Sequence, residues 1–150
     1  MAVTKVLARK GRLDVGIHYV LNGDKTNEQI LTAYLNCDPG HACRQMLDTK
    51  RAMGKTDGVQ YYHIIQSFKP GEVTPEEANQ IGRELALKLT KGSHAFIVCT
   101  HVDKHHVHNH IIINSTTLDC QKKFRNFWGS TWAIRCMNDK LLSLIHISEP

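Results

Sequence analysis

Residues 94–114 read HAFIVCTHVDKHHVHNHIIIN and contain the clearest strand pattern of the chain. Residues 94–101 and 106–114 are both rich in β-branched and aromatic residues, which is typical of strands. The short connection around Asp103-Lys104 predicts a tight turn, so the two strands are expected to pair as an antiparallel hairpin. The fold therefore contains at least one antiparallel strand pair.

Further strands and helices alternate along the rest of the chain. The clearest is a helix in which Thr74 is the N-cap, Pro75 takes the first helical position and Glu77 completes a capping box. The order of elements favours an α+β fold, an antiparallel-rich central sheet with helices packed on one face, over a doubly wound parallel sheet. The remaining predicted elements are strands over 2–7, 30–36 and 59–67, and helices over 13–21, 41–53 and 130–142.

The amino-acid composition limits the classes of protein to which the chain can belong. The chain has 150 residues, 41% of them apolar and 22% charged, which is typical of one globular domain and not of a disordered segment. No apolar run approaches the roughly 18 residues that a membrane span needs, and no secretory signal is expected. The five cysteines form no Cys-x-x-Cys pair, so we expect reduced thiols in a cytoplasmic protein. A net charge of +5 favours polyanions as partners.

Histidine is unusually frequent, with ten in the chain and five of them between residues 101 and 110. Because strand side chains alternate, His106, His108 and His110 share one face. With the turn centred on Asp103-Lys104, His101 pairs with His106 and lies diagonal to His108. Imidazoles that converge in this way predict a site for a divalent first-row metal, with positions left open for a substrate. Asp103 is a candidate to orient one of these imidazoles through a hydrogen bond.

The other histidines are isolated in the sequence, and we interpret each as a surface residue or a satisfied core residue. His63 lies on a predicted central strand, which makes it the strongest of them as a candidate for a further role. These isolated residues are His18, His41, His63, His94 and His146.

Three segments of the chain resemble one known family. The pattern His-x-Asp, then His-x-His-Asn-His and an apolar run ending in Asn114, resembles the metal motif of conjugative relaxases, the mobilisation nucleases of the HUH endonuclease superfamily. Residues 4–26, TKVLARKGRLDVGIHYVLNGDKT, resemble the N-terminal tyrosine motif of the mobilisation-protein branch. Residues 63–82, HIIQSFKPGEVTPEEANQIG, resemble the middle motif of that branch. Together, in family order, these segments cover most of residues 3–120.

The resemblance implies a set of site residues. Tyr19, which falls off the apolar stripe of its predicted helix, would be the nucleophile. His101, His108 and His110 would hold a divalent metal ion, Mg²⁺ or Mn²⁺ in our expectation. The family has an apolar residue between its paired histidines, but Asn109 lies between His108 and His110 here, whereas His106-Val107-His108 has the apolar spacer. His106 is therefore the alternative third ligand.

The resemblance also implies an activity. A relaxase-like enzyme cleaves single-stranded DNA at an origin of transfer, leaves a 5′-phosphotyrosyl link and a free 3′-hydroxyl, and so starts mobilisation of a plasmid or conjugative element. Arg12 and Lys25 lie near the tyrosine in sequence and are candidate DNA contacts. Accessory DNA-binding proteins and a coupling protein are further implied partners.

Other functions remain open at this point. The same chemistry would serve an HUH-type rolling-circle replication initiator or a single-tyrosine transposase, although a tyrosine placed before the histidines favours a relaxase. A non-catalytic, metal-stabilised DNA-binding module is an alternative of a different class. We expect residues 1–142 to form a truncated nuclease domain. Residues 143–150 break the family pattern and are expected to be a non-native tail.

Overall fold

The computed structural model describes residues 3–21, 31–54, 56–103 and 106–120. The predicted helix over 130–142, the expected tail over 143–150 and Lys25 lie outside these residues. In chain order the elements are β1 (Val3–Arg9), α1 (Leu13–Val20), β2 (Leu31–Leu35), α2 (Ala42–Met53), β3 (Tyr61–Phe68), α3 (Pro75–Thr90), β4 (His94–Asp103) and β5 (His106–Thr117).

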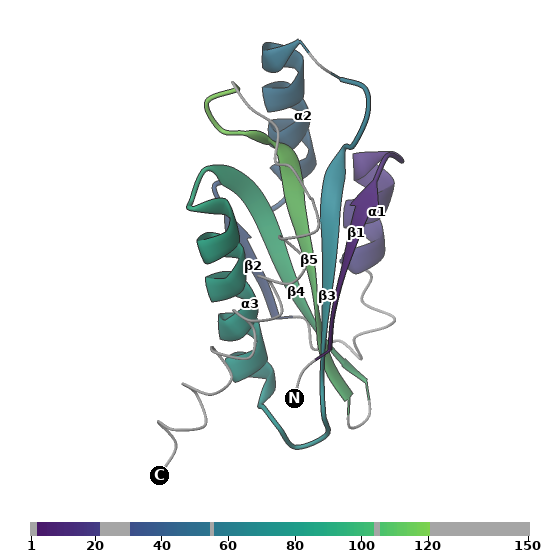
Figure 1. The fold of residues 1–150 in the computed structure, drawn as a ribbon, viewed down its shortest axis with the longest axis vertical. Coiled ribbons are helices and arrows are strands. Elements are labelled where there is room, and N and C mark those ends of the chain that lie inside the picture. The colour runs from purple at the N-terminus through teal and green to yellow at the C-terminus, as the bar shows by residue number, and fades with distance from the viewer. Residues whose placement is uncertain (1–2, 22–30, 55, 104–105, 121–150) are drawn as a thin grey trace.

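The strands form one sheet in the order β1-β3-β5-β4-β2, and every neighbouring pair is antiparallel. The predicted hairpin is β4 and β5, with β5 in the centre of the sheet (Figure 1). The expected α+β class is therefore confirmed.

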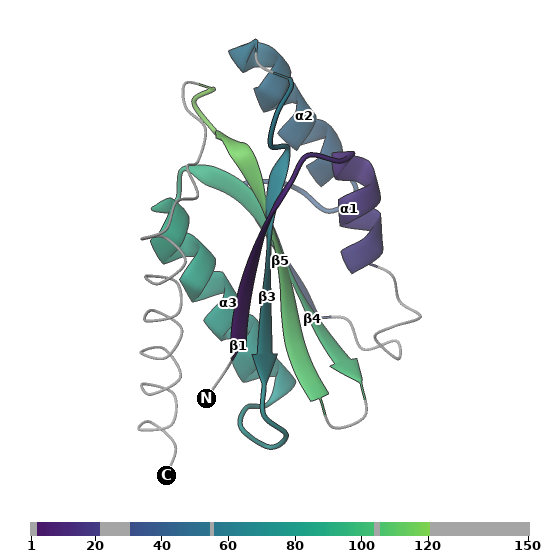
Figure 2. The ribbon, with the colours of Figure 1, turned by 45° about the vertical axis from the view of Figure 1, so that its right-hand side comes forward.

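The helices differ from expectation in one respect, because they cover both faces of the sheet and not one. Leu85 of α3 packs with Phe96 on one face, whereas Ile17 of α1 and Met46 of α2 pack with Ile97 on the other. Figure 2 shows α3 on one side of the sheet and α1 with α2 on the opposite side. The physical reason is that β4 and β5 carry consecutive apolar residues, so both of their faces need cover from water.

Helix α3 begins as predicted, with a capping box. Thr74 Oγ1 accepts a hydrogen bond from the Glu77 amide at 3.2 Å, and a Glu77 carboxylate oxygen accepts one from the Thr74 amide at 2.9 Å. At the other end Lys91 adopts the left-handed region, with φ of 55°.

The buried side-chain amide of Asn109 connects β5 to α3 through hydrogen bonds. Asn109 accepts a hydrogen bond from the Thr100 hydroxyl at 2.6 Å and donates to the Ala78 carbonyl at 2.6 Å and to the Gln66 side chain at 2.9 Å. A Cβ atom at Gly82 would lie 2.7 Å from the Asn109 amide nitrogen, so only glycine lets α3 approach this closely. Because Asn109 points toward α3, its two sequence neighbours point toward α1.

Within the described residues, no helix is long and apolar enough to cross a membrane. The cysteines that the structure describes, which are Cys37, Cys43, Cys99 and Cys120, are all free thiols.

Candidate metal centre and nucleophile

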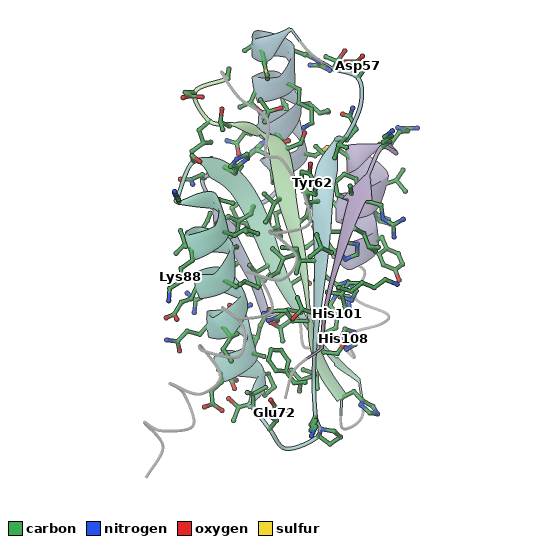
Figure 3. The ribbon with its side chains drawn as sticks, in the orientation of Figure 1. Asp57, Tyr62, Glu72, Lys88, His101 and His108 are labelled. Carbon is green, nitrogen blue, oxygen red and sulfur yellow. The ribbon has the colours of Figure 1, made fainter. Side chains whose placement is uncertain are left out.

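Three histidines gather on the α1 face of the sheet, at the end of the β4–β5 hairpin. His101 comes from β4, and His108 and His110 come from β5. One ligand nitrogen from each lies within 4.8 Å of the others. His101 and His110 are buried and His108 is half-buried. Figure 3 shows the labelled His101 and His108 side by side near the lower end of the sheet. The structure therefore brings together the three residues that the relaxase resemblance implies.

The register of the hairpin differs from our prediction. His101 lies opposite His108, and His106 lies opposite Asp103. β4 continues to Asp103 and β5 begins at His106, so Asp103 is paired within the hairpin. His106 is exposed and does not belong to the group of three.

Helix α1 places Tyr19 beside this cluster. Leu13, Ile17 and Val20 of α1 are buried against the sheet, which leaves Tyr19 on the outer side with 47% of its surface exposed. The ring of Tyr19 meets the ring of His110 edge to face, with 6.3 Å between the ring centroids. The off-stripe position read from the sequence is confirmed.

The last turn of α1 is bonded directly to β4. His101 Nε2 lies 2.7 Å from the carbonyl oxygen of Val20, and the Cys99 thiol donates to the same oxygen at 3.0 Å. This carbonyl is in the last turn of the helix, where backbone carbonyls have no partner within the helix. The contact joins the strand of one candidate ligand to the residue that follows Tyr19.

A fourth histidine contacts the cluster from β3, and the sequence alone did not reveal this contact. His63 Nε2 lies 2.8 Å from His110 Nδ1, and only 6% of His63 is exposed. Burial, together with the charges of Arg9 and His101, lowers the pKa of His63 to about 4. The only sequence signal that pointed to a role for His63 was its position on a predicted central strand.

A groove of about 810 Å³ opens beside Tyr19, between α1, β1 and β3. Its rim carries the exposed cations Arg9, Lys10 and Arg12, and no carboxylate appears among the described residues that line it. Arg12 pairs with Asp14 at 2.7 Å, and both side chains are exposed. The full lining is Ala8, Arg9, Lys10, Gly11, Arg12, Val15, Gly16, Tyr19, Tyr61, His63, Ile65 and His110.

The donor set fits a divalent metal ion. Three imidazoles with nitrogens this close together are a common ligand set for first-row divalent ions. Neutral ligands leave the charge of such an ion undiminished, and a three-residue set leaves positions for a substrate oxygen. His101, His108 and His110 are thus able to hold a divalent ion within reach of Tyr19.

An antiparallel sheet with a histidine triad and a neighbouring exposed tyrosine defines a class of nuclease domain, and the family comparison agrees with it. A model of the relaxase family, described as the MobA/VirD2-like nuclease domain, matches residues 19–143. The chain therefore belongs to this relaxase family.

Curated relatives carry related names. The chain is 42% identical over its whole length to a "Protein rlx" of Staphylococcus aureus, and 51% identical over 71% of its length to another protein of that name and species. It is also 46% identical, over 49% of its length, to the "Group II intron-interrupted relaxase LtrB" of Lactococcus lactis subsp. cremoris (strain MG1363). The chain spans 43%, 34% and 13% of the lengths of these three proteins, respectively.

Proposed function

We propose that this chain cleaves single-stranded DNA at a specific site in an origin of transfer, and so starts mobilisation of a plasmid or conjugative element. The observation that carries the proposal is the placing of exposed Tyr19 beside the triad of His101, His108 and His110, at the edge of a basic groove. Family membership supports the same function.

Tyr19 is the proposed nucleophile. Its phenolic oxygen forms a bond to the scissile phosphorus and loses its proton, while the bond from phosphorus to the 3′-oxygen breaks and that oxygen takes up a proton. The products are a 5′-phosphotyrosyl link and a free 3′-hydroxyl. The exposure of Tyr19 lets a phosphate approach its hydroxyl, which a buried core tyrosine would not allow.

The three histidines are the proposed metal ligands, and Mg²⁺ or Mn²⁺ is the proposed ion. When bound, the ion supplies positive charge for the non-bridging oxygens of the phosphate, where negative charge builds up in the transition state. Asp103 is proposed to orient one ligand imidazole, and His106 stays the alternative third ligand. His101 contacts the last turn of α1, the helix that carries Tyr19, so a phosphate bound at the triad would lie near Tyr19.

The cations of the groove are the proposed DNA contacts. Arg9, Lys10 and Arg12 lie on the rim of the same groove that Tyr19 and His110 line, so a backbone passing them reaches the proposed reaction centre. Lys25 is proposed as a further contact from its place in the tyrosine motif. Accessory DNA-binding proteins and a coupling protein are proposed partners, and the cytoplasm is the proposed place of action.

The proposal is tested by trapping the covalent adduct. The chain is incubated with a random-sequence pool of labelled single-stranded oligonucleotides and with Mn²⁺, Mg²⁺ or EDTA, and adducts are separated on a denaturing gel. We expect a metal-dependent adduct from the wild type whose recovered DNA shares one sequence, and none from Tyr19→Phe. An adduct from Tyr19→Phe overturns the assignment of the nucleophile. DNA binding without any adduct, together with unfolding by EDTA, would instead support the non-catalytic module.

A further inference from the structure

We propose that His63 is a positioning residue that sets which nitrogen of His110 faces the metal ion. The inference rests on the proposed function, because it concerns the same metal centre. It assigns a role to a buried histidine on β3 that the nucleophile, the triad and the groove cations leave unused.

The contact between the two rings is short and shielded from water. His63 Nε2 and His110 Nδ1 are 2.8 Å apart, within hydrogen-bond distance, and the ring centroids are 5.0 Å apart. The exposed fractions of the two residues are 6% and 7%. A hydrogen bond in such a place is costly to break, because water does not replace the missing partner.

The chemistry of a ligand imidazole decides the direction of this bond. A neutral ring binds a metal through its unprotonated nitrogen, so the other nitrogen carries the proton and has to donate it. The nitrogen of His110 that contacts His63 is Nδ1, which leaves Nε2 as the ligand atom. His63 then accepts at Nε2 and carries its own proton on Nδ1.

The sheet holds His63 in this role. β3 lies between β1 and β5, with His63 opposite Leu7 on one side and Ile112 on the other. His110 pairs with Ile65, so His63 and His110 are diagonal neighbours on one face of the sheet. His63 is not in the group whose ligand atoms lie within 4.8 Å of one another, so it supports the triad from outside.

Metal affinity gives the first test. Mn²⁺ binding to the metal-free chain is measured by isothermal titration calorimetry for the wild type, His63→Leu and His63→Gln. Removing a partner that orients a metal ligand typically weakens binding by about 10–100-fold, and we expect that effect for His63→Leu. His63→Gln keeps a hydrogen-bonding group, and we expect it to recover most of the affinity.

His94→Leu is the matched control. His94 is also a buried strand histidine, but its Nδ1 lies 2.7 Å from the Asn114 carbonyl, and it is at the opposite end of β4 from His101. We expect wild-type Mn²⁺ affinity from this variant once it is shown to be folded by circular dichroism. Equal affinity for the wild type and His63→Leu would overturn the inference.

The tautomer of His110 gives a second test that needs no metal and no activity. Long-range ¹H–¹⁵N spectra of the metal-free wild type are expected to show the proton of His110 on Nδ1, and His63→Leu is expected to change this pattern. A proton on Nε2 of His110 in the wild type would overturn the inference. A wild-type chain that binds no Mn²⁺ would overturn the proposed metal centre instead, and the tautomer would still decide the role of His63.

Discussion

His101 Nε2 lies 2.7 Å from the carbonyl oxygen of Val20, the residue that directly follows Tyr19. One candidate metal ligand thus satisfies a backbone carbonyl at the end of the helix that carries the proposed nucleophile. The distance between Tyr19 and the triad is therefore set by a direct bond between β4 and α1, in addition to the packing of Ile17 and Val20.

Replacing His101 is expected to change the metal centre and the end of α1 together. In His101→Ala the Val20 carbonyl is left with one of its two side-chain donors, so the last turn of the helix should open more often. We expect faster hydrogen exchange at the Leu21 amide, which bonds to the Ile17 carbonyl, as well as weaker Mn²⁺ binding. His108→Ala is the matched control and should weaken metal binding without this change in exchange. Equal exchange in both variants would show that the bond to Val20 does not hold the helix.

Replacing the cations of the groove is expected to weaken DNA binding in a salt-dependent way. Each cation that no longer neutralises a phosphate of a single strand should reduce the steepness of log affinity against log salt by about 0.7. For the double variant Arg9→Ala and Lys10→Ala we therefore expect a slope shallower by about 1.4, measured by fluorescence anisotropy with a single-stranded oligonucleotide. Lys88→Ala is the control, because Lys88 is exposed and lies on α3, on the opposite face of the sheet from α1 (Figure 3). A slope that changes as much in Lys88→Ala would mean that the groove is not the DNA path.

Replacing Asn109 by an apolar residue is expected to destabilise the fold. Asn109→Val removes the partner of the Ala78 carbonyl, the Thr100 hydroxyl and the Gln66 side chain, all of which are buried. Unpaired buried groups of this kind should lower the free energy of unfolding by about 3 kcal/mol, measured by urea denaturation. The exposed Gln80→Ala should stay within about 0.5 kcal/mol of the wild type. An Asn109→Val chain as stable as the wild type would contradict this account of the buried network.

The metal-free chain is expected to become less stable as the pH falls below 6.5, and His94 should contribute to the change. Burial lowers the pKa of His94 in the folded chain below its ordinary value of 6.5. As the pH falls through 6.5, the unfolded chain therefore binds the proton first and the free energy of unfolding decreases, until the folded group also titrates. Urea denaturation at pH 7.5 and 5.5 should show a smaller difference for His94→Gln than for the wild type. An unchanged difference would mean that His94 is not the group responsible.

Features that depend on neighbouring residues could be predicted before the fold was known. The capping box at Thr74 and Glu77 and the hairpin around residues 94–114 follow from local spacing, and the structure has both. The off-stripe position of Tyr19 follows from the helical period in the same way.

Which residues meet across the sheet depends on the packing of segments that are far apart in the chain. The register that sets His101 opposite His108 depends on where the strands stop pairing and on cover from α1 and α3 on both faces, and a turn signal does not encode these. His63 meets His110 across 47 positions of chain because β3 returns beside β5. Contacts between distant segments arise from packing that no local spacing records. For that reason the family resemblance implied the three histidines, while the contacts that support them from β3 and α1 were not predicted.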